Sequence, residues 1–203
     1  MTLTDRFGRI HRDLRISLTD HCNLRCTYCM PAEGVPWLPR KTLLTPEELM
    51  RIVRVAVGEG IEEVRLTGGE PLLRPDCVAV VAAIASVEPR PEISITTNGI
   101  GLSRLAEALK QAGLARVNIS LDTLKPDRFH QLTRRNRLAD VLAGIAAADA
   151  AGLHPVKLNA LQLRGINDDE APDLLAFAIE HGYELRFIEQ MPLDAGHTWR
   201  RDS

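Results

Sequence analysis

The chain has 203 residues, of which 45% are hydrophobic and 26% charged, a composition that suits one ordinary globular domain with its own core. Its formal net charge of −2 gives no reason to expect nucleic-acid binding, and the brief basic segment Arg134–Arg137 is typical of a solvated loop. No apolar stretch approaches the roughly 18 residues of a membrane span, and Met1–Arg12 lacks the apolar centre of a signal peptide, so we expect a cytoplasmic protein with reduced thiols.

Short apolar runs typical of strands alternate along the chain with longer amphipathic runs typical of helices. The predicted strands are Leu14–Thr19, Glu63–Thr67, Glu92–Thr97, Arg116–Leu121, Pro155–Leu161 and Leu185–Glu189. The predicted helices are Thr45–Glu59, Pro75–Val87, Leu102–Ala112, Val141–Ala151 and Glu170–His181. Left-handed glycine caps are expected after helical runs at Gly60, Gly113, Gly152 and Gly182.

This alternation indicates an α/β fold with parallel strands and right-handed crossovers, in either a barrel or a doubly wound sheet. Polar, Gly-rich or ligand-type residues follow every predicted strand, and a barrel builds its site from all these strand ends together. A doubly wound sheet would concentrate its site at one switch point instead. We therefore predict one domain over residues 1–203, an open, partial (β/α)6 barrel related to the TIM barrel.

The loop after the first predicted strand carries three cysteines with C-x3-C-x2-C spacing, at Cys22, Cys26 and Cys29. Structural zinc sites and ordinary four-iron clusters both use four protein ligands. Three thiols on one loop therefore favour a four-iron cluster with one iron left open for another ligand. A zinc knuckle completed by His21 or His11 is the alternative interpretation.

Three further strand ends carry residues suited to ligand binding. In Gly68–Pro71 two glycines let the backbone approach a ligand closely, and Glu70 can accept hydrogen bonds from an ammonium group. The segments Thr96–Gly99 and Asn118–Asp122 add hydroxyl and amide groups at the next two strand ends. Each segment alone also fits a simpler role, as a tight turn or, for Asp122, a helix N-cap.

Four cations lie within predicted strands, at Arg15, Arg65, Lys157 and Arg186. A charge inside a barrel is costly unless it is paired or bound to a ligand. Four such charges directed into one cavity suggest a polyanionic substrate such as a triphosphate. The alternative is that they pair with interior acids such as Glu70, Asp122 or Glu189.

Together these motifs resemble the radical S-adenosylmethionine (SAM) enzymes, and within them the GTP 3′,8-cyclases of molybdenum-cofactor biosynthesis. The cysteine spacing, with an aromatic residue before the last cysteine, carries the superfamily resemblance. The segments that narrow it to the cyclases are Arg65–Leu72, Gly165–Asp169 and Met191-Pro192. The resemblance runs through nearly the whole chain, from Phe7-Gly8-Arg9 to Phe187–Pro192.

The resemblance implies that Cys22, Cys26 and Cys29 hold a 4Fe-4S cluster whose open iron binds SAM. Reductive cleavage of SAM would give a 5′-deoxyadenosyl radical that removes hydrogen from C3′ of GTP. The resulting carbon radical would attack C8 of guanine and give (8S)-3′,8-cyclo-7,8-dihydroguanosine 5′-triphosphate, with no side chain acting as a general acid or base.

The resemblance also assigns binding residues by their match to the family's motifs. Those expected around SAM are Tyr28, Gly69, Ser120 and Met191, to which the Gly-Gly loop adds Glu70. Those expected to contact GTP are Arg15, Arg65, Thr96 and Lys157, with Arg186 joining them. The implied partners are GTP, an unidentified reductant protein and the downstream cyclic pyranopterin monophosphate synthase, and the resemblance also allows a homodimer.

The sequence departs from the cyclase family in one respect. Members carry a second, C-terminal three-cysteine cluster that binds the guanine end of GTP, whereas here only Cys77 lies beyond the first loop, in an apolar stretch where a buried, inert thiol is expected. The tail Asp194–Ser203 lacks apolar periodicity, and no sixth helix follows the last predicted strand. We therefore expect the N-terminal part of a cyclase, able to cleave SAM but not necessarily to turn over GTP alone.

Two other functions remain open from the residues. A related radical SAM enzyme acting on a peptide or another small molecule would not need the converging cations. A passive iron–sulfur carrier or metal-binding module would not need the Gly-Gly-Glu-Pro loop and would not bind SAM.

Overall fold

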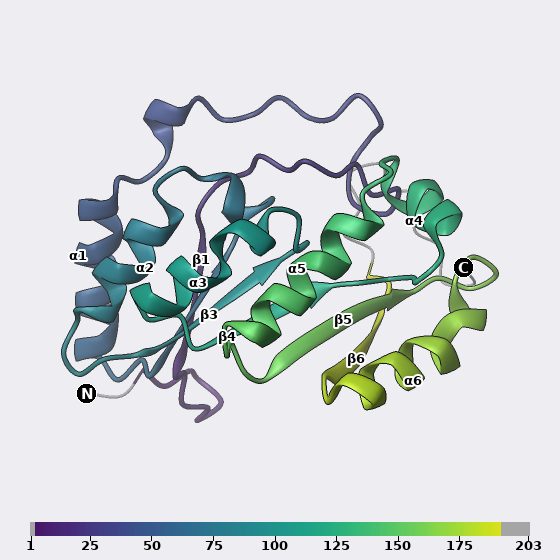
Figure 1. The fold of residues 1–203 in the computed structure, drawn as a ribbon. Coiled ribbons are helices and arrows are strands. Elements are labelled where there is room, and N and C mark those ends of the chain that lie inside the picture. Colours follow the sequence, from purple (N-terminus) through teal and green to yellow (C-terminus); the bar gives the residue numbers. More distant parts are fainter. Residues whose placement is uncertain (1–2, 192–203) are drawn as a thin grey trace.

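The structure, a computed structural model, describes residues 3–191, and its six strands form one sheet. The strands are β1 (Asp13–Ser17), β2 (Glu63–Thr67), β3 (Glu92–Thr97), β4 (Arg116–Ser120), β5 (Val156–Gln162) and β6 (Glu184–Glu189). Neighbouring strands are all parallel, and their spatial order follows the chain from β1 to β6 (Figure 1). This order confirms the open partial barrel, because a doubly wound sheet reverses its strand order at the switch point.

Helices follow the strands and lie against one side of the sheet (Figure 1). The α-helices in the described residues are α1 (Pro46–Gly58), α2 (Cys77–Ala85), α3 (Leu102–Ala112), α4 (Pro126–Thr133), α5 (Leu138–Ala150) and α6 (Ala171–His181). Short 3-10 turns are η1 (Arg40–Thr42), η2 (Pro71–Leu73) and η3 (Asp168–Glu170). In the part of the chain that the structure describes, no helix has the length and apolarity to cross a membrane.

Most predicted helix ends lie within two residues of those in the structure, but α5 begins three residues before its predicted start, and one helix is missing from the prediction. Thr45 and Glu48 form a reciprocal capping box at the start of α1. The four glycines predicted as caps all adopt positive φ, between 70° and 108°. The missing helix is α4. Its buried residues, Phe129, Leu132 and Thr133, are too few for a helical period to stand out in the sequence.

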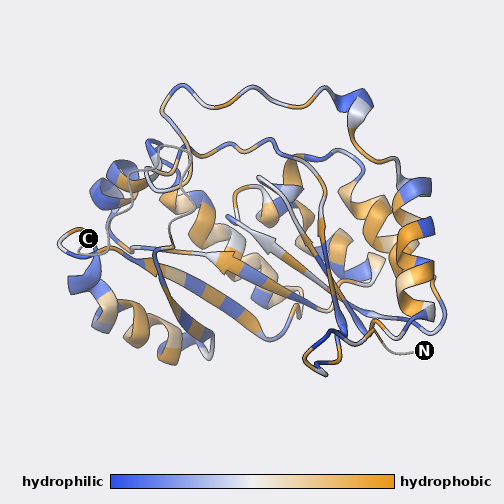
Figure 2. Cartoon of the chain, turned by 180° about the vertical axis from the view of Figure 1, so that it is seen from behind, coloured by the Kyte–Doolittle hydropathy of each residue, from blue (hydrophilic) through white to orange (hydrophobic). Residues whose placement is uncertain are grey.

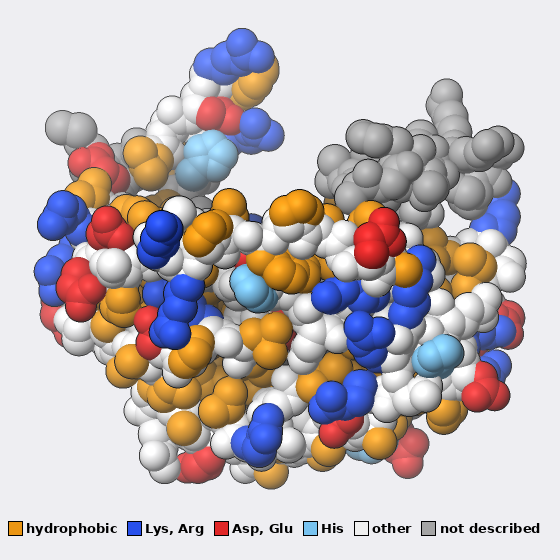
Figure 3. All heavy atoms as spheres, turned by 90° about the horizontal axis from the view of Figure 1, so that it is seen from above, with side chains coloured by type: hydrophobic (Ala, Val, Ile, Leu, Met, Phe, Trp, Pro, Cys, Tyr) orange, Lys and Arg blue, Asp and Glu red, His pale blue; other side chains and the backbone are white. Residues whose placement is uncertain are grey.

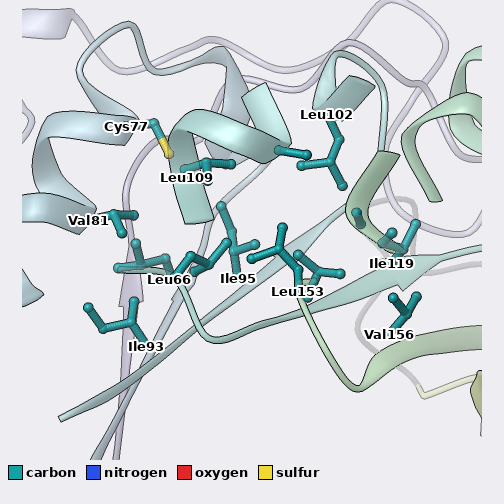
Figure 4. Packing of buried hydrophobic residues seen from close by; sticks show 14 of the residues in the cluster. Leu66, Cys77, Val81, Ile93, Ile95, Leu102, Leu109, Ile119, Leu153 and Val156 are labelled. Atoms are coloured by element: carbon teal, nitrogen blue, oxygen red, sulfur yellow. The ribbon is translucent and has the colours of Figure 1, made fainter. Parts of the chain in front are cut away.

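The hydrophobic core lies between the helices and the sheet. Leu66 and Ile95 in the strands are fully buried against Leu109 of α3, and Figure 4 shows these side chains meeting in one layer. A fully buried Leu or Ile contributes roughly 1.5–3 kcal/mol, so burial of this layer stabilises the fold. Cys77, at the start of α2, is 1% exposed within it, as predicted, and burial raises the pKa of its thiol to about 12.

The opposite face of the sheet is polar. Side chains alternate along a strand, and Figure 2 shows apolar and polar residues alternating along the strands. The positions between the core residues of β1 to β4 include Arg15, Arg65, Ser94, Thr96 and Asn118, and register brings them beside one another. A closed β/α barrel fills its interior with bulky apolar residues. The polar side chains of this inner face suit ligand binding better than packing of a core.

Candidate functional site

The cysteine loop begins after β1, at the carboxyl end of the sheet. Cys22 and Cys26 are half-buried, Cys29 is exposed, and all three are free thiols. The backbone of the loop is held in turns, because the Cys29 amide donates to the Cys26 carbonyl at 3.0 Å. The Arg25 guanidinium donates to the carbonyls of Cys22 and Leu24, each at 2.8 Å. The loop therefore presents its thiols from a fixed backbone.

The three thiols suit a metal cluster better than a single ion. Burial raises the pKa of each thiol, that of Cys26 to about 12, so binding a metal would have to displace their protons. No three His, Cys, Asp or Glu side chains within residues 3–191 converge closely enough to hold one metal ion. An iron–sulfur cluster does not require this convergence, because each thiolate meets a different iron. The donor set therefore fits such a cluster.

The two glycines after β2 let this loop lie directly against the root of the cysteine loop. The Gly69 amide donates to Thr19 O at 2.7 Å, and the Glu70 amide to His21 O at 2.7 Å. A Cβ on Gly69 would lie 2.3 Å from Asp20 O and 2.4 Å from His21 O. Gly68, with φ of 152°, is equally crowded, since a Cβ there would lie 2.3 Å from Thr19 O. The structure thus gives both glycines a packing role.

Glu70 is completely buried, and its carboxylate binds groups of the protein itself. It accepts hydrogen bonds from Thr97 Oγ1 at 2.7 Å, from the Asn98 amide at 2.7 Å and from the Leu72 amide at 3.0 Å. Burial raises its pKa, although these three hydrogen bonds oppose the shift. Glu70 therefore joins the loop after β2 to the end of β3. Its expected bond to the SAM ammonium stays a prediction.

Tyr28 links the cysteine loop to the end of β4. Its hydroxyl donates to Asp122 Oδ2 at 2.5 Å, and the Leu161 amide donates to Asp122 Oδ1 at 2.9 Å. Burial raises the pKa of both side chains, and the Asp122 charge raises that of Tyr28 further. Asp122 is therefore a buried acceptor that joins three segments, rather than a helix N-cap.

Two asparagines complete the connections between the loops. Asn98 Nδ2 donates to Asn23 Oδ1 at 2.7 Å and so ties the end of β3 to the cysteine loop. Asn167, fully buried in the Gly165–Asp169 segment, donates to the carbonyls of Asp122 and Leu161 at 2.8 and 2.7 Å. The sequence placed Asn98 and Asn167 in notable motifs but could not reveal these partners.

The inner-face cations are mostly paired, but not with the acids expected from the sequence. Arg65 binds Asp13 and Glu63 at 3.2 Å each, and Lys157 binds Glu184 at 2.9 Å, with Arg186 3.7 Å from the same carboxylate. The expected acids Glu70, Asp122 and Glu189 form no ion pair within residues 3–191, so the structure confirms pairing with acids and corrects which acids take part. The alternation of Glu63 with Arg65, and of Glu184 with Arg186, is a sequence signal that indicates the observed pairs.

Arg116 is an inner-face cation that the sequence analysis missed. Its guanidinium binds Glu63 and also Glu92, the latter at 2.7 Å, and is largely buried. Burial opposes its charge, but these two carboxylates raise the pKa of Arg116 above its ordinary value. Arg65 and Arg116 thus share Glu63, and Ser94 donates to the same carboxylate at 3.2 Å.

Some polar groups of the inner face are left without a partner in the described structure. Arg15 is exposed and lies directly opposite Arg65 in the register, yet no described residue pairs with its guanidinium. Arg65 Nε and Asn118 Oδ1 are buried and make no hydrogen bond within residues 3–191. Like charges directly opposite each other destabilise a sheet. This face therefore offers both donors and an acceptor to a ligand.

The remaining predicted site residues lie near the same end of the sheet. Thr96 is half-buried and accepts from Asn118 at 3.4 Å, whereas Ser120 is exposed at the end of β4. Met191 follows β6 and is 59% exposed. Pro192 and the tail Asp194–Ser203 lie outside the described residues.

Comparison with known proteins agrees with this arrangement. Residues 16–178 match the model of the radical SAM superfamily. The GTP 3′,8-cyclase of Streptomyces coelicolor is 65% identical over 201 residues, covering 98% of this chain and 59% of that protein. The GTP 3′,8-cyclase of Mycolicibacterium smegmatis is 59% identical over 202 residues, covering 99% of this chain and 56% of that protein. The chain therefore spans less than two thirds of the length of these relatives.

Solved structures share the fold at low sequence identity. Streptococcus suis SuiB has a TM-score of 0.75 at 22% identity, covering 94% of this chain and 42% of SuiB. SuiB bound to S-adenosylmethionine has a TM-score of 0.72 at 22% identity, covering 89% of this chain and 41% of SuiB. Methylornithine synthase has a TM-score of 0.73 at 18% identity, covering 94% of this chain and 57% of that one.

Proposed function

Because the chain belongs to the radical SAM superfamily, we propose that it forms the SAM-cleaving core of a GTP 3′,8-cyclase of molybdenum-cofactor biosynthesis. One observation carries the proposal. Three half-buried or exposed thiols share a loop that is tied to the ends of β2, β3 and β4, beside an inner face of polar and charged side chains. Identity of 59–65% to curated cyclases supports the choice of reaction.

Cys22, Cys26 and Cys29 are the residues that would hold a 4Fe-4S cluster. When bound, the reduced cluster supplies the electron that cleaves SAM into methionine and a 5′-deoxyadenosyl radical. The chain contributes a rigid loop, because hydrogen bonds from Arg25 and Gly69 fix the backbone on either side of Cys22. A separate reductant protein would deliver the electron to the cluster.

Tyr28, Gly69, Ser120 and Met191 are the residues proposed to surround SAM. They come from the loops after β1, β2 and β6 and from the end of β4, at the carboxyl end of the sheet. Tyr28 is oriented by Asp122, which is itself held by Asn167 and Leu161. Glu70, with all its described partners inside the protein, would act on SAM mainly by holding this loop in place.

Arg15, Arg65, Thr96, Lys157 and Arg186 are the residues proposed to bind GTP. Arg15 and Arg65 Nε, for which the described part of the chain offers no partner, support an anion at this face. A triphosphate would take over Lys157 and Arg186 only in competition with Glu184, so these two cations would be shared rather than free. GTP turnover is proposed for the whole protein, with its product passed to cyclic pyranopterin monophosphate synthase.

Anaerobic reconstitution tests the SAM-cleaving core. We expect the chain, loaded with iron and sulfide and reduced with dithionite, to release 5′-deoxyadenosine from SAM. Cys26→Ala should abolish iron uptake and product together. Cys77→Ala is the matched control, because that thiol lies in the apolar layer under the helices, and it should retain both. A wild-type chain that holds its cluster but forms no 5′-deoxyadenosine would refute the proposal.

Nucleotide binding tests the substrate. We expect calorimetry to detect tighter binding of GTP than of guanosine. Arg15→Ala should weaken GTP binding about tenfold or more, the effect of losing a charge-assisted hydrogen bond, and should leave guanosine binding unchanged. Arg12→Ala is the control, because this exposed arginine pairs with Glu62 at the surface and should leave both affinities unchanged. Equal binding of GTP and guanosine would point to another substrate.

A further inference from the structure

The end of α4 is attached to the cysteine loop by backbone hydrogen bonds. The Arg25 amide donates to Thr133 O at 3.0 Å, and the Thr27 amide donates to Leu132 O at 2.8 Å. Basic side chains gather on this face of the molecule toward the end that carries α4 (Figures 1 and 3). In the basic segment that follows α4, three residues are exposed, as expected of a solvated loop, whereas Arg134 is half-buried.

Arg134 adds side-chain hydrogen bonds to the part of the cysteine loop that carries Cys26 and Cys29. Its Nη1 donates to Arg25 O at 2.7 Å and to Met30 O at 3.3 Å. Arg25 immediately precedes Cys26, and Met30 immediately follows Cys29. The two carbonyls therefore flank the segment that contains these two cysteines. A single guanidinium thus holds both ends of the C-x2-C turn.

The backbone of Arg134 has a strained conformation at the position from which its side chain makes these hydrogen bonds. It ends α4 with φ of 57°, and it is the one non-glycine residue with positive φ in the described part of the chain. Glycine fills the corresponding position after α3 and α6, at Gly113 and Gly182. A left-handed conformation costs an L-residue energy that glycine avoids. Such strain is a mark of a residue whose side chain has a function.

We propose that Arg134 is a positioning residue for the thiols of Cys26 and Cys29, an inference that rests on the cluster-binding role proposed above. It fixes the separation of the two thiols by bonding the carbonyls that bracket them. It also places a permanent positive charge beside the cluster site. Reduction adds negative charge to a cluster, so a nearby cation favours the reduced state and raises the reduction potential.

Hydrogen exchange in the apoprotein tests the positioning without any metal. Arg134→Gly removes the guanidinium while relieving the backbone strain, so this variant should fold. We expect amide exchange at residues 26–30 to accelerate about tenfold or more, the effect of losing a charge-assisted hydrogen bond. Arg134→Lys should fall between Arg134→Gly and wild type, because an ammonium retains the charge but lacks the guanidinium fork.

Arg137→Ala is the matched control. It also removes one positive charge from this segment, but its guanidinium pairs with Asp140. Exchange at residues 26–30 should match wild type in this variant. Wild-type exchange in Arg134→Gly would overturn the proposal, as would acceleration of equal size in the amides of α3 and α5.

The reconstituted protein provides a second, independent readout. Arg134→Gly should bind less iron per chain and shift the midpoint potential of the cluster to more negative values, measured by electron paramagnetic resonance during reduction. Arg134→Lys should restore the potential, and Arg137→Ala should leave it unchanged. An unaltered potential in Arg134→Gly would overturn the charge effect. Failure of wild type to take up iron would refute the proposed function, while the exchange result would still decide the role of Arg134 in the loop.

Discussion

At the scale of single residues, the site depends on two buried carboxylates that form no ion pair with any residue between 3 and 191. Glu70 and Asp122 accept hydrogen bonds from hydroxyl and amide groups contributed by separate segments of the chain. Burial raises the pKa of both groups. A buried polar group that loses its partner costs more than the bond itself contributes, so these carboxylates make the loop arrangement specific.

Removal of the Tyr28 hydroxyl tests this idea. We expect Tyr28→Phe to lower the free energy of unfolding by about 1.5–3 kcal/mol, because Asp122 loses its only described side-chain donor and remains buried. Urea denaturation monitored by circular dichroism would measure the change. Tyr183→Phe is the control, since no hydrogen bond of its hydroxyl is found within residues 3–191, and it should change stability by less than about 0.5 kcal/mol.

At the scale of elements, the loops at the carboxyl end of the sheet bind one another as closely as they bind the strands. The backbone after β2 lies against the backbone after β1 at a distance that only glycine permits. The cysteine loop also accepts a hydrogen bond from Asn98 at the end of β3 and donates two from its backbone amides to carbonyls at the end of α4. Its conformation is therefore set by at least four other segments.

Substitution of Gly69 tests the contact between two of these loops. Gly69→Ala would place a Cβ within 2.4 Å of two backbone oxygens, so the loops must separate. We expect a destabilisation of about 1–3 kcal/mol together with loss of iron uptake. Gly58→Ala is the control, because its Cβ meets nothing within 4 Å, and exposed helical Ala is favoured over Gly by up to about 1 kcal/mol. Thermal unfolding and iron analysis would separate the two variants, and normal iron uptake by Gly69→Ala would contradict the expectation.

The elements themselves are largely predictable from sequence, and their failures have physical causes. Apolar periodicity identified every strand, and Gly113 and Gly182 marked helix ends because a left-handed cap favours glycine. Helix α4 was missed because it is short and ends at Arg134, a residue type that gives no capping signal. What holds Arg134 in that conformation is a pair of carbonyls 104 and 109 residues away, which no local pattern can reveal.

At the scale of the whole molecule, ion pairs join strands across the inner face, both between neighbouring strands and from β2 to β4. Glu63 of β2 binds Arg65 of its own strand and Arg116 of β4, while Glu184 joins β6 to Lys157 of β5. The cations were predictable as candidate ligands because they interrupt strands, but their partners were not, since register decides which acid lies beside each. The sequence therefore identified the face of the site and only part of its internal pairing.

The pH dependence of stability tests this network. Burial would raise the pKa of Glu63, but hydrogen bonds from Arg65 and Arg116 outweigh it and hold the pKa below its ordinary value of 4.5. The ionised form therefore stabilises the fold above about pH 4.5, and this contribution disappears as the pH falls through the folded-state pKa. We expect Glu63→Gln to lose about 1.5–3 kcal/mol at pH 7 and progressively less in acid.

Denaturation of wild type and variant between pH 3 and pH 7 would measure the difference. Glu62→Gln is the matched control, because its partner Arg12 is exposed and a surface ion pair contributes at most about 1 kcal/mol. If the stability difference between wild type and Glu63→Gln stayed constant across this range, the ionised form of Glu63 would not be what stabilises the fold.

The bond from Arg134 to the cysteine loop also imposes an order on biosynthesis. Arg134 is made 109 residues after its acceptor Arg25, which at about 5–20 residues per second corresponds to a delay of roughly 5–20 s. For most of that interval the nascent chain carries its three cysteines before Asp122 and α4 have been made to shape their loop. We therefore expect iron to be inserted late, after most of the sheet has emerged from the ribosome, and the exposed thiols to need protection from oxidation until then.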